Sequence, residues 1–308
     1  MKLQYLIIAF AIWIVLSVVL FASRSSSTQP VHDVCEPQRI ISTAPNLTEI
    51  LFALNLDERI VGVSRNSNYP PESEEKPKIG TFWQPNIEAV IAAKPQLIVT
   101  LSFEQQINLA HRLDRMGFNT LTVKIEDLGD LYTAIEKIGT SAGRMQAARQ
   151  VIDSIKTNLN NLSKKVRAYK KPGTLWVVQR RPLRVAGPDT FISRLIQIAG
   201  GKNVVESSIY KYPPIGAEQL YACNPEVIIE ASENCENLRE QRKEALEYYK
   251  KFKGLSAVEN RRIHVIDADS VSRLGPRIDS GAEKITECLH PALTEPACGG
   301  SQLFYDKD

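Results

Sequence analysis

The chain has 308 residues, of which 43% are hydrophobic and 24% are charged, and its formal net charge is +3. A chain of this length and composition buries one large or two ordinary globular cores. Nucleic-acid binding is not expected, because it requires concentrated Lys and Arg. Acidic and basic residues are nearly balanced here, and the basic stretch 164–171 is interpreted as a solvated helix end.

Residues 1–27 are interpreted as an export segment. Lys2 precedes an apolar run over residues 5–22, and a polar stretch follows the run. The run is longer than the core of most secretory signals and nearly as long as a membrane span, so two fates stay open. Ala22 offers a small residue for cleavage of a signal peptide, whereas retention would leave a membrane anchor. No cysteine directly follows the run, which argues against lipid modification.

Residues 38–127 alternate short apolar segments with amphipathic segments, a pattern typical of a parallel sheet covered by helices on both faces. The expected strands are residues 39–42, 60–64, 96–100 and 120–123, and the expected helices are residues 46–54, 87–93 and 105–116. We interpret residues 38–127 as an N-terminal α/β lobe.

Residues 128–169 follow one helical period. Apolar residues recur at every third or fourth position between Leu131 and Leu159, and the stretch contains no proline. This pattern predicts a single long helix, which Pro172 and Gly173 end. The helix is expected to bridge two lobes.

Residues 170–292 repeat the alternation of strands and helices and are interpreted as a C-terminal α/β lobe, followed by a tail over residues 293–308. The expected strands are residues 174–179, 204–205, 226–230 and 263–266, and the expected helices are residues 190–199, 217–223, 240–249 and 279–289. The predicted fold class is therefore α/β, with two Rossmann-like lobes that contain parallel sheets and are bridged by one long α-helix.

Two segments of the first lobe recur in the second. Residues 88–99 (EAVIAAKPQLIV) resemble residues 218–229 (EQLYACNPEVII), and Tyr69-Pro70-Pro71 resembles Tyr212-Pro213-Pro214. A loop, helix and strand with an intervening proline often look alike, but two linked features in the same order favour duplication. Paired lobes place equivalent loops across a cleft, where ligand sites between domains commonly lie.

Aromatic residues are concentrated in the connections that are expected to line this cleft. They are Tyr69, Phe82, Trp83, Tyr210 and Tyr212. Aromatic residues often belong to cores, but these occur in Pro-rich or Gly-rich loops rather than at apolar helix or strand positions. Each ring buried against a ligand contributes roughly 1.5 to 3 kcal/mol, so three of them support tight capture.

The cysteines and histidines do not form a metal-binding pattern. The chain has five cysteines and four histidines, with no C-x-x-C motif and no pair of histidines at helical spacing. A zinc site is therefore not expected, and these residues are interpreted as structural. Catalysis is not expected either, because G-x-S-x-G, H-E-x-x-H and Gly-rich phosphate loops are absent from the sequence.

From residue 39 to residue 289, the chain resembles the periplasmic binding proteins for cobalamin, ferric siderophores and haem. The motifs that carry the resemblance are residues 39–49 (RIISTAPNLTE), 61–64 (VGVS), 68–71 (NYPP), 85–88 (PNIE), 94–99 (KPQLIV) and 275–278 (GPRI). The resemblance implies a class III periplasmic binding protein without enzymatic activity or a cofactor of its own. Such a protein is expected to be monomeric and to deliver its ligand to an ABC transporter, made of a permease dimer and its ATPase, in the inner membrane.

Within that family the chain looks most like the cobalamin binders, so cobalamin is the expected transported ligand. In those proteins, aromatic residues placed like Tyr69, Phe82 and Tyr212 flank the corrin, and residues placed like Asp269 and Arg273 reach its polar edge. Phe82 and Tyr212 stand where the family more often has Trp, and both lie six positions before a repeated Glu.

Two alternatives stay open for the ligand. A ferric siderophore binder is one, because Arg184, Arg273 and Arg277 can face an anionic chelate. A haem binder is the other, because Tyr69 or Tyr212 can ligate iron.

The resemblance also implies two docking residues and a disulfide. Residues placed like Glu88 and Glu218 pair with arginines of the permease in the resembling family. The cysteine that many members have before Gly-Gly-x-Asn is Ala199 here. Cys288 therefore lacks its expected partner, and the candidate pairs are Cys223 with Cys235 or Cys288 with Cys298.

Overall fold

The computed structural model describes residues 36–232 and 237–293. The described residues from Pro37 onward belong to one compact unit, which contains both expected lobes. The expected export segment, residues 1–27, and residues 294–308 of the expected tail lie outside the described ranges. Within those ranges, no helix is both long enough and apolar enough to cross a lipid bilayer.

The first lobe contains a parallel sheet of four strands in the order β2, β1, β3, β4. The strands are β1 (Ile40–Ser42), β2 (Ile60–Val63), β3 (Leu97–Leu101) and β4 (Thr120–Val123). The central strand β1 is buried over its whole length, as expected for a parallel strand covered on both faces. All four strands expected from the sequence are confirmed.

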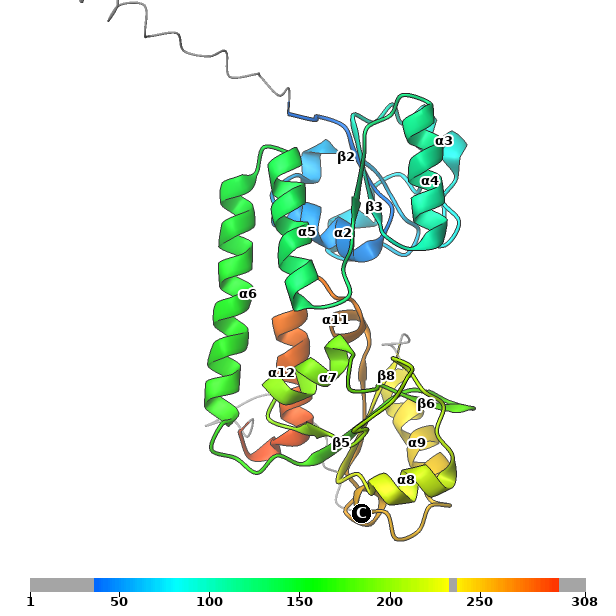
Figure 1. The fold of residues 1–308 in the computed structure, drawn as a ribbon, viewed down its shortest axis with the longest axis vertical. Helices are drawn as coiled ribbons and strands as arrows, with labels where there is room; N and C mark the ends of the chain where they lie inside the picture. The colour runs from blue at the N-terminus through cyan, green and yellow to red at the C-terminus, as the bar shows by residue number, and fades with distance from the viewer. Residues whose placement is uncertain (1–35, 233–236, 294–308) are drawn as a thin grey trace, which may run out of the picture. The chain divides into compact units, whose positions relative to one another are not determined.

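Helices cover both faces of this sheet (Figure 1). They are α2 (Pro45–Ala53), α3 (Ile87–Ala92) and α4 (Glu104–Arg115), with short 3₁₀ helices η1 (Asp57–Arg59) and η2 (Pro71–Ser73). Successive strand residues point to opposite faces, so Ile41 packs with α3 and α4, whereas Ile40 packs with α2.

The segment expected to be one long helix is two helices, so that prediction is wrong in extent. Helix α5 (Leu128–Ser141) ends before Gly143, which has a φ of 70°, and α6 (Met145–Val166) begins just after it. Glycine adopts this left-handed conformation without strain and commonly ends helices. A Cβ on Gly139 would lie 2.5 Å from the Cβ of Ala148, so the two helices pack side by side at close range. The bridging element is therefore α6.

The second lobe contains five strands in a mixed sheet with the path β6, β5, β8, β9, and β7 pairs with β5. The strands are β5 (Gly173–Arg180), β6 (Leu183–Val185), β7 (Lys202–Asn203), β8 (Val227–Ser232) and β9 (Ile263–Asp267). The prediction of an entirely parallel sheet is wrong at β6, which is antiparallel to β5. Arg181 and Pro182 form a two-residue connection, which lets the chain reverse directly into β6.

One hydrophobic core runs through both lobes. The helices of the second lobe are α7 (Phe191–Ile198), α8 (Ala217–Cys223), α9 (Leu238–Tyr249), α10 (Ser256–Glu259), α11 (Asp269–Ser272) and α12 (Ile278–Leu289), followed by η4 (Pro291–Leu293). Helix α6 packs against α5 of the first lobe and against α7 and α12 of the second. Its buried Ile152 and Ile155 belong to the same core cluster as Leu47 and Ile285.

The structure supports one of the two sequence repeats. Helix α3 leads into β3 as α8 leads into β8, and in both copies the residue before proline is left-handed, with φ of 46° at Lys94 and 35° at Asn224. The two Tyr-Pro-Pro copies differ in local structure. The first leads into η2, whereas the second lies beside β6.

Candidate functional site

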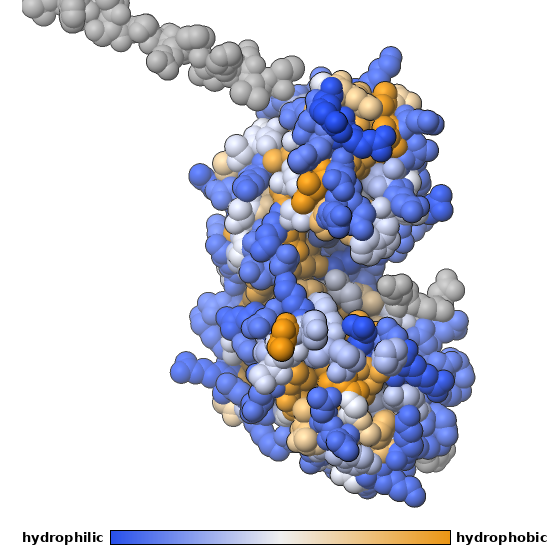
Figure 2. All heavy atoms as spheres, turned by 45° about the vertical axis from the view of Figure 1, so that its right-hand side comes forward, coloured by the Kyte–Doolittle hydropathy of each residue, from blue (hydrophilic) through white to orange (hydrophobic). Residues whose placement is uncertain are grey.

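The segments that carry the expected ligand contacts follow the carboxyl ends of strands. Tyr69 lies after β2 and Asp269 after β9, and Glu126, which was not among the expected contacts, follows β4. In open α/β sheets, ligands bind outside the carboxyl ends of the strands. These segments also make contacts between the lobes, Lys211 with Glu126 and Arg273 with Asn68, where the molecular surface narrows (Figure 2). The strand ends of both sheets therefore meet in one region.

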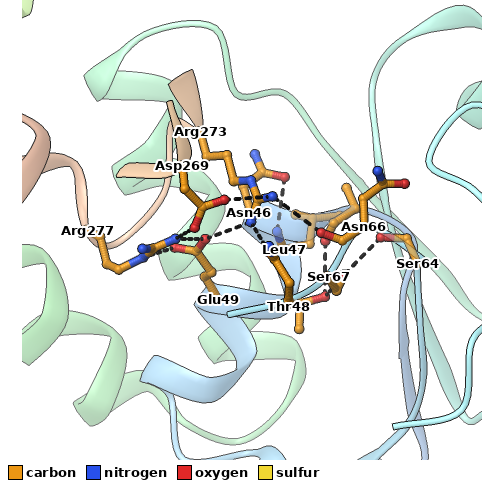
Figure 3. Close-up of polar contacts among 12 residues, drawn as sticks. Asn46, Leu47, Thr48, Glu49, Ser64, Asn66, Ser67, Asp269, Arg273 and Arg277 are labelled. Atoms are coloured by element: carbon orange, nitrogen blue, oxygen red, sulfur yellow. Dashed lines mark hydrogen bonds and ion pairs between the residues drawn. The ribbon is translucent and has the colours of Figure 1, made fainter. Parts of the chain in front are cut away.

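A group of charged side chains joins the two lobes in this region (Figure 3). We call Glu49, Asp269, Arg273 and Arg277 the interlobe polar group. Arg277 donates from Nε to Glu49 Oε2 at 2.9 Å and from Nη2 to Glu49 Oε1 at 2.6 Å. Asp269 accepts from Arg277 at 2.9 Å and from Arg273 at 2.7 Å. Glu49 belongs to the first lobe and the other three to the second, so the group ties the lobes together.

Neutral polar groups surround these charges. Arg273 donates from Nη1 to the side chain of Asn68 at 2.7 Å, and Asn46 donates from Nδ2 to the carbonyl of Leu274 at 3.2 Å. The guanidinium of Arg277 lies 3.5 Å from the centre of the Tyr69 ring, which is a cation–π contact. Tyr69, Asp269 and Arg273, which were predicted separately as ligand contacts, are thus brought together.

Glu49 is the most buried member of the group, with 4% of its surface exposed. Burial raises the pKa of the Glu49 carboxyl, although the hydrogen bonds and charge of Arg277 act in the opposite direction. Burial also disfavours the Arg277 cation, but Glu49 and Asp269 outweigh that effect and raise the pKa of Arg277. Each charge therefore depends on its partners.

Buried hydroxyl groups hold the loop that meets Arg273. Thr48 of α2 donates to Ser42 at 2.8 Å and hydrogen-bonds Ser67 at 2.9 Å, and Ser67 is 2.9 Å from the hydroxyl of Ser64 (Figure 3). Thr48 and Ser67 are buried. The network fixes the start of α2 against the loop that contains Asn66 and Asn68, and both of these accept from Arg273.

A tight turn of the first lobe displays Phe82 and Trp83. The Thr81 nitrogen donates to the Gln84 carbonyl at 3.2 Å, and the Gln84 nitrogen donates to the Thr81 hydroxyl at 3.0 Å. Gly80 starts the turn with a φ of 102°, and a Cβ there would lie 2.6 Å from the Asn86 nitrogen. Glycine is therefore required at this position.

Phe103, the N-cap residue of α4, completes an aromatic cluster with this turn. Its ring centre lies 4.8 Å from that of Phe82 and 5.5 Å from that of Trp83. Trp83 is 63% exposed, whereas Phe82 is half-buried against the main core. Gln106 is fully buried and donates to the Phe82 carbonyl at 3.1 Å, which anchors the turn to the lobe.

In the second lobe, Tyr210 and Tyr212 lie on a segment that runs beside β6. The Gly187 nitrogen donates to the Lys211 carbonyl at 2.8 Å, and Arg184 donates to the Tyr212 carbonyl at 3.3 Å. Tyr212 is half-buried against the main core, and burial raises the pKa of its hydroxyl, whereas Tyr210 is 69% exposed.

Lys211 lies between these two tyrosines in the sequence and reaches the other lobe. Its ammonium pairs with Glu126, after β4, at 2.5 Å. This ion pair is exposed, so it contributes little stability on its own. It nevertheless places the aromatic segment of the second lobe beside a strand end of the first.

Some contributors to the site were not predicted from the sequence. Phe103 could have been found, because it is an aromatic residue in a connection between a strand and a helix, and the aromatic residues that were singled out also lie in connections. Glu49 carries a weaker signal, a carboxylate next to apolar Ile50 and Leu51 on a helix that packs into the core. Nothing in the sequence distinguishes Gln106 from an ordinary helix residue.

The expected docking residues occupy equivalent positions. Glu88 is the second residue of α3, and Glu218 is the second residue of α8. Both are exposed, and neither forms an ion pair with any residue that the structure describes. Their role in docking stays a prediction.

The described cysteines are Cys223 and Cys288, and both are free thiols in the structure. Their candidate disulfide partners, Cys235 and Cys298, lie outside the described residues, so the pairings stay predictions. Burial raises the pKa of the Cys288 thiol to about 12. Among the residues of ranges 36–232 and 237–293, no cluster of three or more His, Cys, Asp or Glu is arranged to hold a metal ion.

Comparison with known proteins identifies the class. The signature of the family described as "Periplasmic binding protein" matches residues 40–270, and the chain belongs to this family. It is accordingly a substrate-binding protein of the ABC importer type and not an enzyme. The fold is that of the class III periplasmic binding proteins.

Two curated relatives cover most of the chain. An uncharacterized ABC transporter substrate-binding lipoprotein, YvrC of Bacillus subtilis, is 28% identical over 86% of this chain and 84% of its own length. The vitamin B12-binding protein of Vibrio cholerae is 25% identical over 82% of this chain and 89% of its own length.

Solved structures show the same architecture. A possible iron-binding periplasmic solute-binding protein from Staphylococcus epidermidis is 30% identical, with a TM-score of 0.72 over 83% of this chain and 99% of that one. A periplasmic haem-binding protein from Pseudomonas aeruginosa shares the fold at 24% identity, with a TM-score of 0.72 over 83% of this chain and 94% of that one.

Proposed function

We propose that this protein captures cobalamin in the periplasm and delivers it to an ABC transporter in the inner membrane, acting as a monomer. The family membership supports capture and delivery, and the vitamin B12-binding relatives support the ligand. Residues 1–27 would act either as a signal peptide that is removed or as an anchor. Capture of a ferric siderophore or of haem is the alternative, since a possible iron-binding protein and haem-binding proteins share the fold.

The charge balance of the interlobe polar group is the observation that carries the choice of cobalamin. Arg273 pairs with Asp269, and Arg277 pairs with both Asp269 and Glu49. Two positive and two negative charges leave the group without net charge. The edge of a corrin carries amide groups, which donate and accept hydrogen bonds without bringing a charge. A neutral polar group suits such an edge.

Haem and anionic ferric chelates require a different electrostatic environment. Their carboxylates and other anionic oxygens are best recognised by guanidinium groups that are free to pair with them. Arg273 and Arg277 already pair with carboxylates. These contacts favour a neutral ligand over an anionic one.

The aromatic side chains supply the apolar part of the proposed contact. Phe82 and Trp83 stand at the tip of a turn in the first lobe, and Tyr212 lies beside β6 in the second. Their rings would cover the flat faces of a corrin, with Asp269 and Arg273 at its polar edge. Burial of each ring would contribute roughly 1.5 to 3 kcal/mol to binding.

The test is to incubate the purified protein separately with cyanocobalamin, ferric siderophores and haemin, and to measure the absorbance of what co-elutes in size exclusion. We expect the corrin spectrum in the protein fraction. Retention of haemin or of a ferric chelate, with no retention of cyanocobalamin, would contradict the proposal and favour the corresponding alternative.

A further inference from the structure

Glu49 determines the net charge of the interlobe polar group. Asp269 is shared by Arg273 and Arg277, with contacts of 2.7 and 2.9 Å. One carboxylate shared by two guanidinium groups leaves one positive charge. Glu49 supplies the second carboxylate, through its two hydrogen bonds with Arg277 and a 3.8 Å contact with Arg273. Without Glu49, the group would be cationic.

Among the described residues, no further charged side chain acts on Glu49 besides Arg273, Arg277 and Asp269. The side chains of Asn46 and Asn68 and the carbonyl of Asn66 are neutral partners of the same cluster. The nearby Asp267 pairs with Lys284 at 3.1 Å. Position 275 is glycine, and a Cβ there would lie 3.4 Å from Glu49 Oε2, so the backbone closely covers the carboxylate.

Stability alone does not explain a carboxylate at this position. Desolvation of a buried ion pair offsets much of its Coulomb energy, and apolar residues of similar volume are often equally stable in its place. Helix α2 already presents Leu47, Ile50 and Leu51 to the core. The distinctive effect of Glu49 is therefore electrostatic, and it acts beside Asp269 and Arg273, the residues expected to meet the ligand.

We infer that Glu49 is a specificity-determining residue, which neutralises Arg277 so that the polar edge of the ligand meets no net charge and anionic ligands are disfavoured. The inference rests on the proposed function, because it assumes that the ligand edge reaches the interlobe polar group. Glu49 itself need not touch the ligand, since its effect passes through Arg277.

The test compares two ligands that differ in one charge, cyanocobalamin and its monocarboxylate, in which one edge amide is hydrolysed to a carboxylate. We expect the parent protein to bind the amide form about tenfold more tightly, and Glu49→Gln to remove or reverse that preference. Arg277→Gln leaves the group anionic and should strengthen the preference. The double variant, Glu49→Gln with Arg277→Gln, restores neutrality and should restore the parental ratio.

Glu58→Gln is the matched control, because Glu58 is an exposed carboxylate of the same lobe. Its ratio of dissociation constants should equal that of the parent. Thermal unfolding of each variant verifies folding, and if Glu49→Gln does not fold, the opposite shift expected for Arg277→Gln decides the question. Equal ratios in the parent and in all folded variants would mean that Glu49 only tethers the lobes, and would overturn the inference.

A second ligand pair separates this inference from the proposed function. If the parent binds no cyanocobalamin, the same variants are titrated with haemin and with its dimethyl ester, in which the two propionates carry no charge. If Glu49→Gln raises the affinity for haemin relative to that for the ester by about tenfold, the inference is supported although cobalamin is the wrong ligand. An unchanged ratio, or a parent that binds none of the four ligands, would overturn it.

Discussion

Phe82 and Tyr212 are both half-buried against the core, and each lies six residues before the equivalent Glu88 or Glu218. We expect Phe82→Ala and Tyr212→Ala each to weaken cyanocobalamin binding by about tenfold or more, because each removes a ring that the ligand would cover. Isothermal titration measures the effect. Tyr212→Phe keeps the ring and should bind nearly as the parent does. Unchanged dissociation constants in both alanine variants would exclude an aromatic sandwich.

We expect His264 in β9 to make the second lobe sensitive to acid. Its Nε2 is buried and has no hydrogen-bond partner among the described residues. Burial, with the charges of Arg242 and Arg262, lowers the pKa of His264 from 6.5 to about 4. Between these pH values the unfolded chain binds a proton that the folded protein does not. The free energy of unfolding therefore falls as the pH falls through this window, by up to about 3 kcal/mol at its lower end.

Urea unfolding at about pH 7.5 and about pH 5 tests this effect in the parent and in His264→Gln. Between the two pH values, the free energy of unfolding should fall by about 2 kcal/mol less in the variant than in the parent. His111→Gln is the control, because His111 is exposed on α4. An identical pH dependence in the parent and His264→Gln would show that the histidine remains protonatable in the folded state.

At the scale of helices and strands, the sequence predicts the bounds of an element best where a proline ends a segment of regular hydrophobic periodicity. Helix α8 begins and ends at the expected residues, and the other expected elements, apart from the single long helix, are present within a few positions. Strand β6 was missed, because three residues, one of them the exposed Arg184, are too short for an alternating pattern. The break at Gly143 was missed, because Ala142 and Met145 continue the apolar period across it.

The turn between α5 and α6 can be tested with two glycines. Gly143 has a φ of 70°, so Gly143→Ala strains the backbone and should lower the free energy of unfolding by about 1 kcal/mol. Gly129 lies near the start of α5 in helical conformation, and a Cβ there would approach only Asp127 Oδ1, at 3.2 Å, so Gly129→Ala should destabilise less than Gly143→Ala does. Urea unfolding measures both. Equal effects of the two substitutions would contradict two separate helices.

At the scale of the whole described chain, the site depends on contacts that no local sequence pattern contains. The pairing of Glu49 with Arg277 joins residues that are 228 positions apart. The expected Asp269 and Arg273 were supplied by resemblance to a family, and the structure adds that their charges are already balanced within the protein. The continuous core along α6 explains how two lobes hold such a pair at hydrogen-bond distance.

Delivery of the ligand requires a second surface, and Glu88 and Glu218 are the proposed contacts. Each is exposed at the start of a helix, where a carboxylate also complements the helix dipole, so a local role alone would account for roughly 0.3 to 1 kcal/mol. Two related lobes that present equivalent charges suit a permease dimer with two-fold symmetry. Exposed ion pairs contribute only roughly 0.2 to 1 kcal/mol each, so these would orient the protein rather than hold it tightly.

We therefore expect the double change Glu88→Arg with Glu218→Arg to leave folding and cyanocobalamin affinity nearly intact, while abolishing ligand uptake by cells and stimulation of the transporter ATPase. Glu58→Arg with Glu72→Arg makes the same charge change at exposed positions of the first lobe and should transport normally. Normal transport by the folded Glu88 and Glu218 double variant would exclude the docking role. Loss of cyanocobalamin binding in that variant would instead place the two carboxylates in the ligand site or the fold, because a charge that serves only the permease does not affect capture.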